Sequence, residues 1–174
     1  MNGLLRTCLL GVSVFVGVTS TDVAADRRVV DVVDVGSPSS EAAHGYAAYN
    51  DTLDVFNGTP VRRTRGWLHY TLTTFDDTAV TIACTFVGTA SGSYDLLVED
   101  RVVATGHDEG GGGSRVREID VPFAITKGKS SIVVVLRARD GQTPALRQLR
   151  TIQDHNEVAP LFARPSFSHS GVFR

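Results

Sequence analysis

Trp67 is the aromatic side chain best placed for ligand binding, because Arg63 and Arg65 precede it closely in the sequence. The apolar C–H faces of a sugar ring pack on an indole ring, while its hydroxyls bind charged hydrogen-bonding groups. An exposed tryptophan beside arginines therefore favours a carbohydrate site. The alternative is a tryptophan that caps one end of the core, and the sequence supports both interpretations about equally.

A second polar and aromatic group consists of Glu41, His44 and Tyr46. A carboxylate, an imidazole and a phenol at this spacing offer donors and acceptors to sugar hydroxyls. The same groups are suited to fixing the loop that carries them. The sequence favours this structural role somewhat over ligand binding.

Catalytic and metal sites find little support in the sequence. No Gly-x-Ser-x-Gly elbow marks a serine nucleophile, and the five histidines are too scattered for a zinc site. Asp108 and Glu109 beside the Gly110–Gly113 tract could bind calcium, but an exposed acidic loop is the favoured interpretation. A glycosidase would need a pair of carboxylates, and the candidates are Asp76, Asp77, Asp95, Asp108 and Glu109. Acidic side chains in predicted turns are usually solvated, which disfavours such a catalytic pair. The sequence predicts no catalytic residue, no metal and no cofactor.

The bulk composition limits the partners and the location of the chain. Its 174 residues, 42% of them hydrophobic, suit one domain. A net charge of −2 and a pI near 6.2 argue against nucleic acid and membrane surfaces as partners. Residues 1–25 are predicted to be a cleavable signal peptide. The alternative is a membrane anchor, but the apolar run from Cys8 to Val18 is short for a helix that spans a membrane. We therefore expect a secreted or periplasmic protein in which Cys84 is the remaining cysteine.

Alternating apolar and polar residues from Gly66 to Thr105 predict strands with one buried and one wet face. With further strands downstream and no convincing helix, the pattern indicates an all-β fold, a sandwich or jelly roll of about eight or nine strands. Cys84 is predicted to be an inert, buried thiol. The side chains predicted to face inward are Leu68, Tyr70, Leu72, Val80, Ile82, Cys84, Phe86, Tyr94, Leu96, Val98, Ile119, Val121, Phe123, Ile132, Val134, Leu136 and Ala138.

The domain is predicted to span residues 26–154, with a poorly ordered tail over 155–174. Strands are expected over 28–35, 52–56 and 145–153. A loop is expected over 41–50, with one helical turn capped by Ser40 as the alternative. Val133 and Val135 face outward on a strand that is apolar on both sides. Such a strand is usually central or covered by another segment or partner.

The chain resembles the accessory β-sandwich domain at the C-terminal end of glycoside hydrolase family 146 enzymes, relatives of the family 127 β-L-arabinofuranosidases. The resemblance covers most of the mature domain, and its pieces are VVDVGSPSSEAAH (32–44), GWLHYTL (66–72), VGTASGSYDLLVEDRVVAT (87–105) and ITKGKSSIVVVLRAR (125–139). It implies a galactose-binding-like jelly roll that binds substrate. The family's hairpin Asp-Gly is replaced here by Glu99-Asp100.

The resemblance also implies contact residues. Ser40-Glu41-x-x-His44 and Gly66-Trp67 match the family's pattern, so Glu41, His44 and Trp67 are the implied substrate-binding residues. Arg63 and Arg65 are added for their proximity to Trp67. The family's catalytic cysteine and zinc ligands belong to a helical barrel that this sequence lacks, so activity does not transfer.

Two functions remain open. The first is a non-catalytic module that binds a plant-type or arabinose-containing glycan, alone or beside a glycoside hydrolase catalytic domain. The alternative is a structural or interaction β-sandwich that packs against a hydrolase or another partner, which outward-facing Val133 and Val135 would favour. An enzyme with an unrecognised active site is the least favoured reading.

Overall fold

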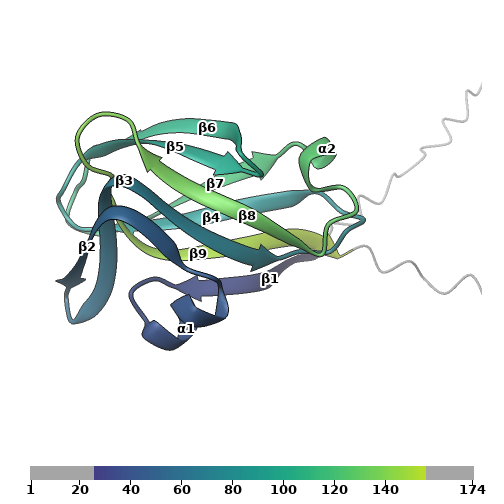
Figure 1. Ribbon diagram of the computed structural model, residues 1–174, viewed down its shortest axis with the longest axis horizontal. Coiled ribbons are helices and arrows are strands. Elements are labelled where there is room, and N and C mark those ends of the chain that lie inside the picture. Colours follow the sequence, from purple (N-terminus) through teal and green to yellow (C-terminus); the bar gives the residue numbers. More distant parts are fainter. Residues whose placement is uncertain (1–25, 156–174) are drawn as a thin grey trace, which may run out of the picture.

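Residues 26–155 are described by a computed structural model and form nine strands and two short helices (Figure 1). The predicted signal peptide (1–25) and nearly all of the predicted tail (156–174) lie outside the described residues. Neither described helix is long and apolar enough to cross a membrane. The elements are β1 (Asp26–Asp34), α1 (Pro38–Ala43), β2 (Ala47–Phe56), β3 (Thr59–Thr73), β4 (Val80–Val87), β5 (Gly92–Val98), β6 (Arg101–Asp108), β7 (Ser114–Val121), α2 (Phe123–Thr126), β8 (Ser131–Ala138) and β9 (Ala145–His155).

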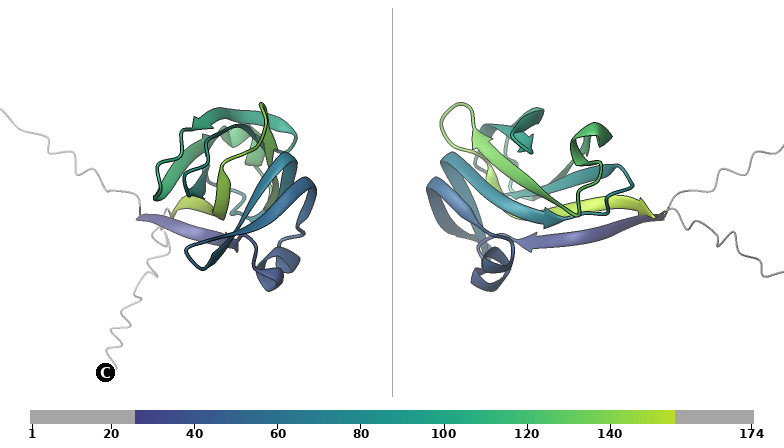
Figure 2. Two further views of the ribbon diagram at one scale, coloured as in Figure 1. Left: turned by 90° about the vertical axis from the view of Figure 1, so that its left-hand side faces the viewer. Right: turned by 45° about the vertical axis from the view of Figure 1, so that its right-hand side comes forward.

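The strands form two antiparallel layers that face each other across one core (Figure 2). The first layer, which we call the upper sheet, has the order β2-β3-β8-β5-β6. The second layer, the lower sheet, has the order β1-β9-β4-β7. The long strand β3 links the layers, because Arg62 near its start pairs with Leu146 of β9. The predicted all-β sandwich is confirmed.

The predicted alternation of buried and wet faces is confirmed on β3, whereas β4 and β5 are buried on both faces, including Ala83 and Thr85, which were predicted to face outward. Leu68, Tyr70 and Leu72 are fully buried, whereas Trp67 lies on the opposite, outer side of β3. Cys84 is also buried, and burial raises the pKa of its thiol to about 12, which keeps it protonated and unreactive. Other fully buried side chains come from both sheets, namely Ile82, Phe86, Leu96, Val98, Val134, Leu146 and Leu149.

The position of strand β8 within the upper sheet accounts for the apolar residues on its outer side. It lies between β3 and β5 in the upper sheet, so the prediction of a central strand is confirmed. Val133 and Val135 are half-buried rather than exposed. They therefore lend less support to a partner-binding face than the sequence suggested.

The loop predicted over residues 41–50 is wrong. Helix α1 begins at Pro38, whose fixed φ and missing N–H suit the first helical position, and β2 begins at Ala47. The alternation is hidden in β2 because its register against β3 shifts between Tyr49 and Asp51, where Asn50 has a positive φ of 56° and faces a bulge of two β3 residues, Arg65 and Gly66.

The inward position predicted for Phe123 is also wrong. Phe123 is the first residue of α2 and is exposed. Strand β7 ends at Val121, and Pro122 starts the helix, so the period of two does not continue.

Two tight hairpin turns use residues with positive φ. Asn57-Gly58 joins β2 to β3 in the manner expected for that dipeptide. Glu99-Asp100 joins β5 to β6, although neither residue is a glycine. The Glu99 carboxylate compensates by accepting hydrogen bonds from the Val133 N–H and the Lys129 ammonium group, at 2.8 and 2.9 Å.

Candidate functional site

Glu41 is a buried anchor of the fold rather than a surface residue. Its carboxylate accepts two hydrogen bonds from the Arg62 guanidinium, Nε to Oε1 at 2.6 Å and Nη2 to Oε2 at 2.8 Å. Oε1 also accepts the Gly36 N–H at 2.8 Å and the Tyr70 hydroxyl at 3.3 Å. A planar, two-pronged pair of this kind is strong and geometrically specific.

Arg62 extends this network to β2. Its Nη1 donates to Asp51 Oδ2 at 2.6 Å, and its guanidinium carbon lies 4.4 Å from the centre of the Tyr46 ring. The Tyr46 hydroxyl donates to the same Asp51 oxygen at 2.6 Å. The hydrogen bond to Glu41 outweighs burial and raises the pKa of Arg62, and burial raises the pKa of Tyr46. Arg62 is therefore charged and Tyr46 neutral at physiological pH.

His44 ties α1 to β1. Its Nδ1 lies 2.6 Å from the Ser40 carbonyl oxygen and its Nε2 lies 3.1 Å from Asp31 Oδ1. Both neighbours only accept hydrogen bonds when Asp31 is ionised, so both ring nitrogens must carry protons for both bonds to form. Burial opposes this charge, but the bonds to Ser40 and Asp31 outweigh it and raise the pKa of His44 above its ordinary 6.5.

Together these residues form a clasp that fastens β1, α1 and β2 to β3. Its members are Asp31, Glu41, His44, Tyr46, Asp51 and Arg62. Glu41 is only 4% exposed, and the side chains of Glu41 and His44 are engaged within the clasp. Their predicted role as ligand contacts stays a prediction, and their placement favours the structural role for the Glu41, His44 and Tyr46 group.

The structure separates Arg63 and Arg65 from the clasp. Arg63 donates from Nη2 to Asp54 at 2.7 Å and lines a small cleft of about 120 Å³ between the β2–β3 hairpin and Gly88–Ala90. Arg65 is exposed at the bulge in β3. The two arginines are thus near Trp67 in sequence, but among the described residues no hydrogen bond joins either of them to the Trp67 side chain.

Gly66 sets the path of β3 just before Trp67. A Cβ at this position would lie 2.5 Å from the Tyr49 carbonyl oxygen and 2.6 Å from Tyr49 Cδ1, so only glycine fits without a shift of β2. Tyr49 is the register partner of Trp67, and the next pair inward, Ala48 with Leu68, faces the core. Tyr49 and Trp67 therefore share the outer face, where they are 65% and 37% exposed.

The register of the upper sheet extends this aromatic pair into a row across all five strands. Trp67 pairs with Arg137 of β8, Arg137 with Asp95 of β5, and Asp95 with Thr105 of β6. Residues directly opposite each other on neighbouring strands point to the same face. We call this set the outer row: Tyr49, Trp67, Arg137, Asp95 and Thr105.

The polar half of the outer row is internally bonded. Arg137 Nη2 donates to Asp95 Oδ2 and the Thr105 hydroxyl donates to Asp95 Oδ1, both at 2.8 Å. These two hydrogen bonds hold the pKa of Asp95 below its usual value. Arg139 Nε lies 3.8 Å from the same carboxylate, and the side chains of Arg137 and Arg139 are about half exposed.

The neighbouring line of side chains on the same face is largely apolar. It contains His69, Val135, Leu97 and Val102, which the register places opposite one another on β3, β8, β5 and β6. The outer face thus presents exposed aromatic rings, a fixed arginine–carboxylate pair and an aliphatic border. Such a surface can stack on the apolar face of a sugar ring and bind its hydroxyls.

Sequence reasoning found Trp67 and missed the other four members of the outer row. Asp95 was considered only as one of several acids in turns, and Arg137 sits at the end of an apolar strand. The alternation places each of them on an outer face. The sequence of a single strand does not determine which strands are its neighbours or in what register they pair.

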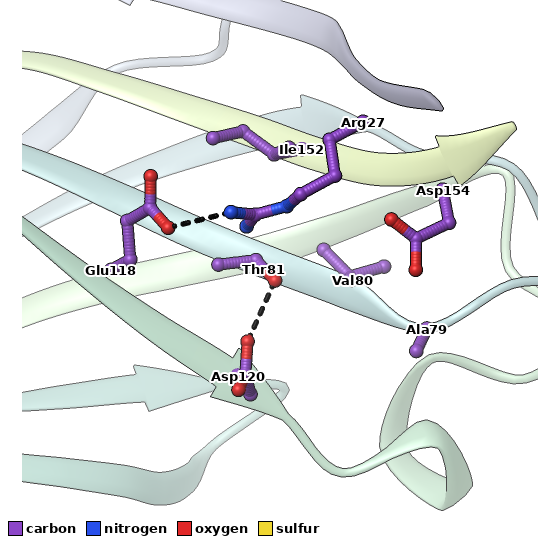
Figure 3. A pocket seen from close by; sticks show the side chains of 8 residues that line it. All are labelled: Arg27, Ala79, Val80, Thr81, Glu118, Asp120, Ile152 and Asp154. Atoms are coloured by element: carbon purple, nitrogen blue, oxygen red, sulfur yellow. Dashed lines mark hydrogen bonds and ion pairs between the residues drawn. The ribbon is translucent and has the colours of Figure 1, made fainter. Parts of the chain in front are cut away.

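The lower sheet carries a depression of about 560 Å³ on its outer face (Figure 3). Across it, Arg27 Nη1 donates to Glu118 Oε2 at 3.0 Å, and the Thr81 hydroxyl donates to Asp120 at 2.7 Å. Ile152 and Asp154 of β9 complete much of the lining. This depression has carboxylates and aliphatic groups but no aromatic ring in its lining.

The acidic loop at Asp108 is also engaged in the fold. The Asp108 carboxylate is buried and accepts hydrogen bonds from Arg115 and from the Gly110 N–H. Arg115 also donates to the Gly88 and Gly113 carbonyls, so it fastens the glycine tract. Within residues 26–155, no group of three or more His, Cys, Asp or Glu side chains is arranged to hold a metal ion.

Comparison with known proteins gives one family and several similar folds. A family of unknown function, DUF6805, matches residues 24–152. No curated protein matches the chain.

Three solved structures illustrate the fold. A family 35 carbohydrate binding module from an environmental isolate has a TM-score of 0.54 at 15% identity, covering 71% of this chain and 96% of that one. The CBM35 from Cellvibrio japonicus Abf62 has a TM-score of 0.51 at 14% identity, covering 72% and 96%. The ANX1 ectodomain from Arabidopsis thaliana has a TM-score of 0.56 at 8% identity, covering 75% of this chain and 50% of that one. At these identities the likeness shows the fold alone, and it confirms the predicted jelly-roll β-sandwich.

Proposed function

We propose that this chain, which belongs to the DUF6805 family, is a non-catalytic carbohydrate-binding module whose binding surface is the outer row. The observation that carries the proposal is the exposed Tyr49 and Trp67 pair, continued on the same face by the Arg137–Asp95 ion pair. The fold shared with family 35 carbohydrate binding modules supports it.

The finer parts of the proposal rest on the resemblance to family 146 accessory domains. They are an arabinose-containing or plant-type glycan as ligand, a glycoside hydrolase catalytic domain as partner, and a secreted or periplasmic location. The DUF6805 match neither names a glycan nor links the chain to those hydrolases. Mass spectrometry of the protein recovered from its host would test the location, because cleavage after Ala25 would leave Asp26 as the first residue.

Titration calorimetry against a panel of soluble glycans, arabinans included, tests the binding function. We expect at least one glycan to bind, and Trp67→Ala to weaken that binding at least tenfold while the melting temperature stays nearly unchanged. Phe75→Ala is the matched control, since Phe75 is exposed to a similar degree but lies outside the outer row. Equal loss in both variants, or no binding by the native chain to any glycan, would count against the proposal.

Within this proposal the chain has no catalytic role. The hydrogen bond from Arg137 keeps the Asp95 carboxylate of the outer row ionised, which suits hydrogen bonding rather than general acid catalysis. Incubation with chromogenic arabinofuranosides should release no dye. Turnover above the background of a Trp67→Ala preparation would overturn this part.

A second candidate function is packing against a partner domain. The observation that favours it is the lower sheet, which carries the charged depression and on whose strands β1 and β7 Val29, Val32 and Val116 are exposed. Light scattering tests this function: a second copy as partner gives a dimer mass that Val116→Lys abolishes. A monomer at all concentrations, and no complex with a hydrolase encoded beside it, would contradict the function.

A further inference from the structure

We infer that the outer row binds an internal stretch of an extended glycan chain, which lies across the strands rather than ending in a pocket. This inference rests on the proposed function, because it specifies the ligand of the same surface. It concerns the length of the ligand and the direction in which it runs.

The first argument is the length of the row. Its five members lie on five neighbouring strands, one residue per strand. Four spacings of about 4.8 Å between strands give a row of roughly 19 Å. A row of this length is several times the width of one sugar ring, so it offers contacts to a run of consecutive sugars.

The second argument is that both ends of the row are open. Tyr49 lies on β2 and Thr105 on β6, which are the outermost strands of the upper sheet. Both residues are exposed. A surface built to hold a chain end needs a wall at one side, whereas a row that reaches both edges of its sheet allows a chain to continue past it.

The third argument is the order of chemistry along the row. The β2–β3 end offers two aromatic rings, and the β8–β5–β6 end offers the half-exposed Arg137 guanidinium, which the largely buried Asp95 carboxylate holds in place. Asp95 is itself fixed by the Thr105 hydroxyl, so the Arg137 guanidinium that it binds is oriented in advance. Sugars at one end would bind mainly by stacking, and sugars at the other end mainly by hydrogen bonds.

The order of chemistry gives an experiment that separates the two ends. The probes are linear arabinan, xylan and galactan, each with its free monosaccharide, disaccharide, tetrasaccharide and hexasaccharide. The variants are Trp67→Ala at the aromatic end, and Asp95→Asn and Thr105→Val at the polar end. Melting temperatures of all variants are recorded first, so that a folding defect is not read as lost binding.

We expect affinity to rise from the disaccharide to the tetrasaccharide and then to level off. Trp67→Ala should weaken every length. Asp95→Asn should weaken the tetrasaccharide about tenfold, and Thr105→Val somewhat less, with little effect of either on the disaccharide. Chemical reduction of the terminal sugar of the hexasaccharide should leave its affinity unchanged.

Two results would overturn the inference while the proposed function stands. One is a monosaccharide or disaccharide that binds as tightly as the hexasaccharide. The other is loss of binding when the terminal sugar is reduced, which would mean recognition of a chain end. If none of the polymers or oligosaccharides binds, the proposed function itself fails, and this inference fails with it.

Discussion

Two arginine–carboxylate pairs with similar distances occupy different environments in this molecule. In the clasp, Arg62 and Glu41 bond at 2.6 and 2.8 Å, and their side chains are 15% and 6% exposed. In the outer row, Arg137 and Asp95 bond at 2.8 Å, and their side chains are 47% and 12% exposed. The first pair has its donors and acceptors occupied by the fold, whereas the second keeps an exposed guanidinium.

The difference shows why residue type alone misassigns function. Glu41 and His44 have the chemistry of a binding site, but the fold uses that chemistry to hold α1 against β3. Arg137 and Asp95 have the same chemistry on an outer face, where the half-exposed Arg137 guanidinium is available to a ligand. Exposure of the arginine separates a pair that holds the fold from a pair that can recognise something else.

The largest effect should come from breaking the clasp. Arg62→Ala leaves the Glu41 carboxylate buried without its partner, and we expect a loss of about 3 kcal/mol in the free energy of unfolding. Urea denaturation measures it. Arg63→Ala is the control next to it in sequence, and it should change the midpoint little, because its partner Asp54 is exposed and can return to water. Equal midpoints for the two variants would remove the distinction between the clasp and exposed pairs.

A smaller loss should follow from Gly66→Ala, which links the two regions. The new Cβ meets the Tyr49 carbonyl, so β2 or β3 must shift, at a cost of about 2 kcal/mol. Glycan binding should fall as well, because Tyr49 and Trp67 flank this position. Gly113→Ala, where a Cβ has open space, is the matched control. A variant with native stability and native binding would show that the close approach at Gly66 is unimportant.

The histidine of the clasp should make stability depend on pH. The pKa of His44 is raised above 6.5, so its contribution is complete below pH 6.5 and is lost as the pH rises through the folded value. The pKa of Asp31 is lowered below 3.8, because hydrogen bonds from Thr73 and His44 outweigh burial, so its contribution is lost as the pH falls through its folded value. Between these limits His44→Gln should cost about 1 kcal/mol after allowance for solvent screening. The native and variant stability curves should converge at high pH; a constant difference across pH 5 to 9 would contradict an ionised His44.

The smallest stability effect should come from the exposed pair. Asp95→Asn should cost less than about 1 kcal/mol in unfolding experiments, because Arg137 can return to water. The same variant should weaken binding of long oligosaccharides, so the two measurements separate. A loss of stability as large as that of Arg62→Ala would mean that the outer row is a second clasp and not a recognition surface.

The core was predictable because its information is local. A period of two in the sequence predicts the burial of Leu68, Tyr70 and Leu72, and the dipeptide Asn57-Gly58 predicts a hairpin turn. The clasp was not predictable, since Glu41 and Arg62 are separated by twenty-one residues and meet only when α1 folds onto β3. The outer row depends on the pairing of β3 with β8 and of β8 with β5, which no single segment encodes. Trp67 was found because an outward aromatic is visible from alternation alone.

The pairing of the first strand with the last has a practical consequence. Asp26 lies opposite His155 at the end of the β1–β9 ladder, so the described domain is entered and left at neighbouring points (Figure 2). Both points belong to the lower sheet, while the outer row belongs to the upper one. Residues 26–155 could therefore be spliced as a cassette into a surface loop of an unrelated host protein, or circularly permuted, with the outer row still facing solvent.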